Sequence, residues 1–129
     1  MNKENFIKKV HLIISLIIVI PVSLIYGFKP TFQFDIHLNT TDELTVFKAM
    51  MGLYLGFSVL WILGLLKKNY LFAALVSNVV FMLGLGVGRL ISFAIDGFPS
   101  FLLVFGTFGE LFLGCYGLWV LKKFKHISI

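Results

Sequence analysis

The stretch that decides the fold is residues 67–95, KKNYLFAALVSNVVFMLGLGVGRLISFAI. It opens with Lys67 and Lys68, and from Tyr70 to Ile95 Arg89 is the one charged side chain. A helix of about 20 apolar residues is long enough to cross the hydrocarbon core of a bilayer, which is roughly 30 Å thick. The sequence therefore predicts a membrane-spanning helix over residues 70–95, with a basic turn at its start.

Three further runs of the same kind occur at residues 10–28, 44–66 and 101–121. Apolar residues make up 59% of the 129-residue chain and charged residues 13%, about half the charged share of a typical soluble domain. A chain this short could not bury so much apolar surface in water. Together the runs predict a single all-α membrane domain over residues 1–129.

The lysines fall on one side of these runs. Eight of the eleven basic residues lie before the first run, between the second and third, or after the fourth: Lys3, Lys8, Lys9, Lys67, Lys68, Lys122, Lys123 and Lys125. Cytoplasmic segments of membrane proteins carry such an excess of lysine and arginine. Short connections make consecutive helices antiparallel, so we expect an up-down four-helix bundle with both termini in the cytoplasm.

The first run also has the basic start and apolar core of a signal peptide. A cleavage site needs small residues at two positions, and the best candidate places Ile25 at one of them, before Gly27. Retention as a helix is therefore favoured over cleavage. Pro21 lies inside this helix and is expected to bend it or to mark a packing point.

Two connections on the outer side carry recognisable turn and capping chemistry. Residues 29–41 alternate apolar and polar side chains, which predicts a short extended segment lying over the bundle rather than a free linker. Thr40 followed by Glu43 is typical of a capping box at the start of the second helix. Asp96-Gly97 predicts a turn after the third helix, and Ser100 is expected to cap the fourth.

Three charged residues lie inside the spans: Lys48, Arg89 and Glu110. Such residues are costly in a membrane and mark function by default. The helical rise places them about 6, 9 and 13 Å from the outer end of their helices. Side chains lean toward the N-terminus of their own helix, so Arg89 and Glu110, on antiparallel neighbours, should converge. We therefore predict an Arg89–Glu110 ion pair.

The helical faces extend this cluster. Asn78, Arg89 and Asp96 share one face of the third helix, and Asp96 is a second candidate partner for Arg89. On the fourth helix Gly106, Gly114 and Gly117 share the face of Glu110. Opposite it are Phe101, Phe105, Phe108, Phe112 and Trp119, which are expected to face lipid. Four further glycines are expected near the buried faces. Gly52 and Gly56 flank the side of Lys48, from which Tyr54 and Trp61 turn away, and Gly84 and Gly88 lie beside the Arg89 face, where they would allow close helix contact.

Two interpretations of the cluster remain open. In one, Arg89 and Glu110 are a structural pair that sets helix register, and Lys48 reaches the headgroups. In the other, Lys48, Arg89, Glu110, Asn78 and Asp96, with Thr107 or Tyr116, line an outward-facing site for a small polar or anionic ligand or a lipid headgroup. A structural or partner-binding subunit is the alternative function.

No catalytic or metal constellation is recognisable. His11, His37 and His126 are divided between the two sides of the membrane and cannot form one metal site. Cys115 lies alone within an apolar run, and the lysines beside the spans do not indicate nucleic-acid binding. We therefore expect no enzyme activity and no cofactor. The expected partners are the lipid bilayer and either a helix of another membrane protein or a second copy of this chain.

Several local motifs resemble a family of small bacterial four-helix membrane proteins known as domain of unknown function 4345. They are Phe47-Lys48-Ala49-Met50-Met51-Gly52-Leu53-Tyr54-Leu55-Gly56, Gly88-Arg89-Leu90-Ile91-Ser92, Asp96-Gly97-Phe98-Pro99-Ser100 and Glu110. The resemblance implies an integral protein of the bacterial cytoplasmic membrane with a polar cluster near its outer face. It implies no activity.

Overall fold

The computed structural model describes residues 3–28, 36–37 and 39–123. It consists of four long helices: α1 (Lys3–Phe28), α2 (Thr41–Leu66), α3 (Leu71–Asp96) and α4 (Phe101–Lys123). A short 3₁₀ helix, η1 (Lys68–Tyr70), turns the chain between α2 and α3. All four α-helices are long and apolar enough to cross a membrane. The predicted all-α class, with four helices long and apolar enough to span a membrane, is thus confirmed.

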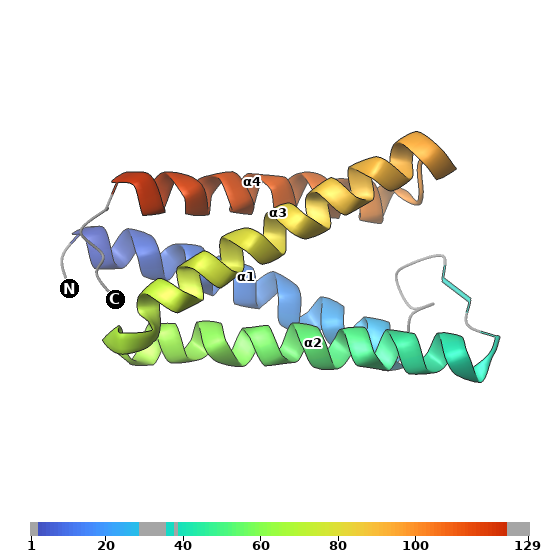
Figure 1. Ribbon diagram of the computed structural model, residues 1–129, viewed down its shortest axis with the longest axis horizontal. Helices are drawn as coiled ribbons and strands as arrows, with labels where there is room; N and C mark the ends of the chain where they lie inside the picture. Colours follow the sequence, from blue (N-terminus) through green and yellow to red (C-terminus); the bar gives the residue numbers. More distant parts are fainter. Residues whose placement is uncertain (1–2, 29–35, 38, 124–129) are drawn as a thin grey trace.

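The helices run up and down, as predicted (Figure 1). The start of α1, the turn between α2 and α3, and the end of α4 lie together, so Lys67, Lys68, Lys122 and Lys123 gather at what we call the basic end. The opposite end holds Phe28, Thr41, Asp96 and Phe101.

The four helices form two antiparallel pairs. α1 packs along α2, and α3 packs along α4, while α1 and α3 also touch across the bundle. Within the described residues α2 and α4 do not meet. α3 crosses the bundle obliquely, from beside α2 at the basic end to beside α4 at the opposite end (Figure 1). The two pairs are therefore joined most tightly at the basic end.

The predicted helix ends are largely confirmed. The backbone N–H of Glu43 donates to Thr40 Oγ1 (3.1 Å), and that hydroxyl donates to Glu43 Oε1 (2.9 Å), so Thr40 caps α2. Gly97 ends α3 with a positive φ of 93°, which favours glycine. Ser100 precedes α4, but its carbonyl rather than its side chain accepts from Leu103 and Val104. The Ser100 hydroxyl has no described partner.

The predicted extended segment over residues 29–41 lies mostly outside the described residues, which here include 36, 37 and 39–41. Ile36 packs against the hydrophobic core. The covering role of the remainder stays a prediction.

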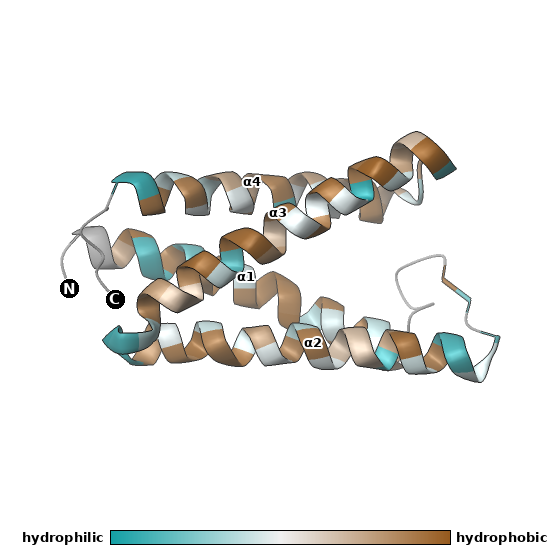
Figure 2. Ribbon diagram, in the orientation of Figure 1, coloured by the Kyte–Doolittle hydropathy of each residue, from teal (hydrophilic) through white to brown (hydrophobic). Residues whose placement is uncertain are grey.

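The outer surface of the bundle is apolar. In Figure 2 the brown of apolar residues covers most of each helix, while teal gathers at turns and helix ends. The predicted aromatic face of α4, opposite Glu110, points outward, because five aromatic side chains are exposed there: Phe101, Phe105, Phe108, Phe112 and Trp119. A surface of this kind suits a hydrocarbon solvent rather than water.

The predicted inner face of α2 is wrong. Tyr54, Ser58 and Trp61 are buried, whereas Lys48, Gly52 and Gly56 are exposed. An atom added at the Cβ position of Gly52 or Gly56 would meet nothing within 4 Å. Since α2 is apolar around its whole circumference, its hydropathy does not show which face is buried.

The predicted close-contact glycines of α3 are also wrong. Gly84 and Gly88 are exposed, with no atom within 4 Å of an added Cβ. The close approach of α3 to α4 occurs instead at Gly86, where an added Cβ would overlap Leu111. Gly86 is two residues from each predicted glycine, so the contact lies on nearly the opposite side of the helix.

Candidate polar site between the helix pairs

The predicted ion pair between α3 and α4 is present. Arg89 Nη1 lies 3.0 Å from Glu110 Oε2, and the two side chains are 21% and 14% exposed. Gly106 lies beside the pair, where an added Cβ would be in ordinary contact, 3.8 Å from the same guanidinium nitrogen. The pair joins α3 to α4 and leaves this part of the bundle without net charge.

Two tyrosines complete the polar group. Arg89 Nη2 donates to Tyr26 Oη across a distance of 2.9 Å, which ties α3 to the far end of α1. Tyr54 of α2 packs edge-on against Tyr26, with ring centroids 5.8 Å apart. The Tyr54 hydroxyl lies near the Arg89 guanidinium but has no partner in hydrogen-bond geometry among the described residues. All four helices therefore contribute to one polar group.

A cavity of about 220 Å³ lies beside this group. Tyr26, Tyr54, Arg89 and Glu110 form its polar side. The remaining wall is apolar or glycine: Ile18, Val19, Val22, Met82, Leu85, Leu102, Leu103, Phe105, Gly106, Gly109 and Leu113. Ile18, Leu102 and Phe105 belong both to this wall and to the exposed surface. The cavity therefore reaches the apolar outside of the bundle where α1 faces α4.

The seam between α1 and α4 is closed nearer the basic end. The His11 ring is fully buried, and its Nε2 donates to the Leu113 carbonyl at 2.8 Å. Tyr116 packs edge-on against that ring and donates from its hydroxyl to the Ile7 carbonyl (3.2 Å). At Gly117 an added Cβ would come within 3.0 Å of His11 Nε2. The cavity begins where these contacts end.

The sequence of the chain matches a described family. Residues 7–121 match the family described as Domain of unknown function (DUF4345). The chain belongs to this family. No curated protein and no solved structure matches it. Membership in the family agrees with the predicted resemblance and supplies no activity.

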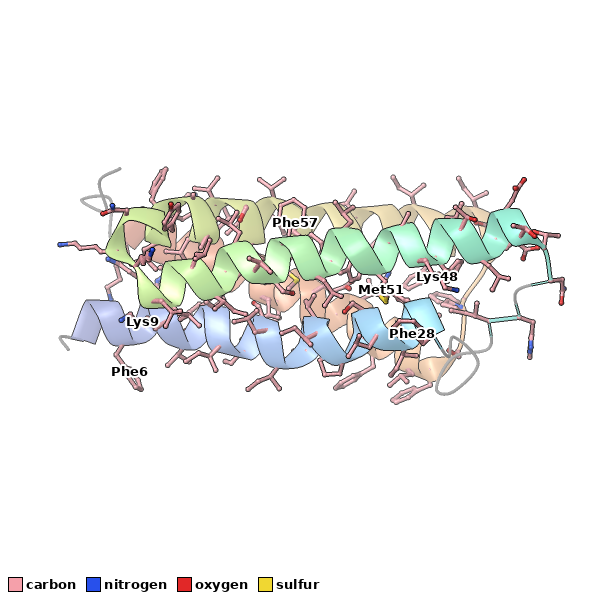
Figure 3. The ribbon with its side chains drawn as sticks, turned by 90° about the horizontal axis from the view of Figure 1, so that it is seen from below. Phe6, Lys9, Phe28, Lys48, Met51 and Phe57 are labelled. Atoms are coloured by element: carbon pink, nitrogen blue, oxygen red, sulfur yellow. The ribbon has the colours of Figure 1, made fainter. Side chains whose placement is uncertain are left out.

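The structure leaves Lys48 outside the polar site. Lys48 is exposed on α2 and does not line the cavity. Figure 3 shows it one turn from Met51, near Phe28 at the end of α1. An added Cβ on Gly27 would overlap Met51, so α1 and α2 are in close contact there. The expected cluster of three charges is therefore a neutral pair, with Lys48 apart from it on the surface.

Asn78 and Asp96 lie on the same helix as Arg89 but at different positions along its axis. Asn78 lies eleven positions before Arg89, about 16 Å along the axis, and is fully buried. Its amide nitrogen and oxygen have no partner among the described residues. Asp96 lies about 10 Å beyond Arg89, exposed, and accepts from the Ser92 hydroxyl at 3.0 Å. The described structure has no Asp96–Arg89 ion pair.

Thr107 and Tyr116 do not reach the cavity either. Thr107 is buried and donates to the Leu103 carbonyl of its own helix at 2.8 Å, and Tyr116 belongs to the closed part of the seam. Within the described ranges, no three His, Cys, Asp or Glu side chains come together to hold a metal ion.

The roles of Tyr26, Tyr54 and His11 were not predicted from the sequence. A tyrosine near the end of a span is ordinarily an interfacial anchor, so Tyr26 gave no sign of its bond to Arg89. Tyr54 was assigned to the wrong face of α2. A histidine inside a span is a signal in its own right, and His11 lies one position into the first predicted run.

Proposed function

We propose that this protein is a multi-pass membrane protein that holds a lipid-like molecule in the cavity between α1 and α4. The cavity itself carries the proposal: its wall is mostly apolar, its polar side is a buried ion pair with two tyrosines, and its rim is formed by exposed Ile18, Leu102 and Phe105. A ligand with an apolar body and one polar group fits such a wall, whereas a small free anion does not.

The position of the cavity favours entry from the bilayer. In a spanning orientation, the exposed side chains at the rim face hydrocarbon, so a lipid chain reaches the cavity without crossing water. About 220 Å³ exceeds the roughly 150 Å³ of an apolar protein cavity that holds benzene and is below the ~300 Å³ of drug-sized sites. We therefore expect one chain segment or ring to enter, with the rest of the ligand remaining in the membrane.

The lysines support an orientation. With the basic end in the cytoplasm, the cavity and the Arg89–Glu110 pair lie in the outer half of the membrane. We place the protein in the bacterial cytoplasmic membrane with both termini inside. Cysteine labelling at position 37 and at position 129 in intact cells tests this. Labelling of position 129 from outside would reverse the orientation.

Two matched glycines test the binding function. Gly109 lines the cavity, whereas Gly84 faces outward from α3, and an added Cβ meets nothing within 4 Å at either position. Gly109→Leu therefore fills the cavity, and Gly84→Leu adds the same side chain outside it. The measurement is the lipid that co-purifies with each protein in a mild detergent, extracted and quantified by mass spectrometry.

We expect a molecule enriched with the wild type, retained by Gly84→Leu and reduced about tenfold by Gly109→Leu. Equal amounts of co-purified lipid from all three proteins would contradict the proposed binding function. The alternative, a partner-binding subunit, is favoured by the exposed Gly52–Gly56 and Gly84–Gly88 pairs, because small residues four apart allow close packing of membrane helices. Loss of a co-purifying protein from Gly84→Leu alone would support it.

A further inference from the structure

The polar side of the cavity is electrically neutral. Arg89 and Glu110 are the charged residues of the cavity wall, and they are bonded to each other. A carboxylate or phosphate would meet Glu110 as well as Arg89, and an ammonium group would meet Arg89 as well as Glu110. In a site of low dielectric constant, a further charge without a counter-charge is strongly disfavoured. The site therefore selects an uncharged polar group.

Two polar atoms of the wall residues lack a bond. Glu110 Oε1 and Tyr54 Oη are both buried without a hydrogen-bond partner in the described part of the chain, although the other Glu110 oxygen is bonded to Arg89. Buried polar atoms are ordinarily paired, and unpaired ones need an explanation. The terminal torsion of a glutamate is broad, so small rotations suffice to present Oε1 to a molecule in the cavity.

The types of these atoms restrict the ligand. A carboxylate oxygen only accepts hydrogen bonds, whereas a tyrosine hydroxyl donates one and also accepts. A group that satisfies both must donate to Glu110 Oε1 and accept from Tyr54 Oη. Ethers, esters and ketones accept but do not donate. A hydroxyl does both with a single oxygen.

We propose that the polar group held at Arg89, Glu110 and Tyr54 is an uncharged hydroxyl, and that the ligand is a lipid alcohol with a long-chain or ring hydrocarbon body. This inference rests on the proposed function and names the ligand class of the same cavity. The hydroxyl donates to the free oxygen of Glu110 and accepts from Tyr54, while the hydrocarbon lies against the apolar wall and leaves through the rim.

Three probes of equal chain length test the class: dodecan-1-ol, methyl dodecyl ether and dodecanoate. Each is titrated into the purified full-length protein in detergent, and its apparent Kd is taken from occupancy in native mass spectrometry and from the melting temperature. We expect the alcohol to bind about tenfold more tightly than the ether, as one charge-assisted hydrogen bond would give. Dodecanoate should bind weakest.

Variants connect the preference to named atoms. Tyr54→Phe removes a hydroxyl that has no bond in the described structure, so it should fold normally and weaken the alcohol about fivefold. Tyr116→Phe, outside the cavity, is its matched control and should leave alcohol binding unchanged. Glu110→Gln leaves the Arg89 charge uncompensated, so it should raise the affinity for dodecanoate above that for the alcohol.

The outcomes separate this inference from the function on which it rests. If none of the probes binds and Gly109→Leu changes nothing, the cavity is not a ligand site and both fail. If all three bind equally, or Tyr54→Phe and Glu110→Gln leave their order unchanged, the alcohol assignment fails while lipid binding stands. The alcohol preference, its loss in Tyr54→Phe and its reversal in Glu110→Gln together support the assignment.

Discussion

Two pairs of glycines on α4 differ in how closely neighbouring side chains pack against them. Gly114 and Gly117, nearer the basic end, are buried where Leu83, Val79 and His11 would overlap or crowd an added Cβ. Gly106 and Gly109, farther along, border the cavity, and an added Cβ would meet only Arg89 Nη1, at Gly106. Glycine in one half permits dense packing and in the other leaves space.

This difference between the glycines indicates that the two halves of the bundle are stabilised by different interactions. The closed half relies on close apolar packing, with hydrogen bonds between α1 and α4 from His11 to the Leu113 carbonyl and from Tyr116 to the Ile7 carbonyl. The open half relies on polar bonds, from Arg89 to Glu110 and to Tyr26, that span the helices beside the cavity. Changes that remove polar groups should therefore harm the open half most, and changes in side-chain size should harm the closed half most.

The largest effect should come from breaking the ion pair. Arg89→Met or Glu110→Gln leaves one partner without its counter-charge in a largely buried position, and we expect a loss of about 3 kcal/mol in unfolding free energy. The double variant should lose less than the sum. Unfolding of the purified protein in mixed micelles measures this, and strictly additive losses would show that the pair does not act as a unit.

The next effect sharpens the contrast between the glycines. Gly117→Ala adds a Cβ that would overlap Val79 and should cost about 2 kcal/mol of unfolding free energy through overpacking. Gly109→Ala adds the same methyl group where nothing lies within 4 Å, and should stabilise by about 0.5 kcal/mol through helix propensity. Equal effects of the same sign would mean that both sites are packed alike.

The two tyrosines of the open half should differ by about 1.5 kcal/mol. Tyr26→Phe removes the acceptor of the 2.9 Å bond from Arg89 and should destabilise by that amount. Tyr54→Phe removes a hydroxyl without a described partner and should be neutral or slightly stabilising. A destabilising Tyr54→Phe would indicate that the hydroxyl is satisfied, contrary to the geometry. Thermal melting of both variants beside the wild type decides between these outcomes.

The smallest effect concerns the bond in the closed half. His11→Phe keeps an aromatic ring beside Tyr116 but loses the bond to the Leu113 carbonyl, and we expect a loss of about 1 kcal/mol. Tyr116→Phe loses only a weaker, partly buried bond to Ile7 and should cost about 0.5 kcal/mol. Melting curves in detergent compare the two. If His11→Phe lost more unfolding free energy than Arg89→Met, the histidine bond would stabilise the bundle more than the ion pair does.

Much of the site could not be predicted because the exposed surface of this bundle is apolar, as its interior is. In water, the polar face of a helix identifies its outside, but in lipid the inside and the outside are both apolar. The prediction for α4 was right because its phenylalanines and its glycines fall on opposite faces. The prediction for α2 is wrong because large and small apolar residues lie on both of its sides, and because Lys48 is exposed rather than on the buried face.

What the sequence alone determined is local or follows from charge. The four spans, their antiparallel order, the cap at Thr40 and the turn at Gly97 follow from hydrophobic length, short connections and backbone preferences. The Arg89–Glu110 pair also followed, because unpaired charges in a membrane are costly and helical rise gave their depths.

The oblique path of α3, the gap between α1 and α4, and the meeting of Tyr26 and Tyr54 at the ion pair were decided only by the tertiary structure. They depend on how side chains of different sizes fit between four helices at once. No single helix carries that information, since each contact is a property of two or more surfaces.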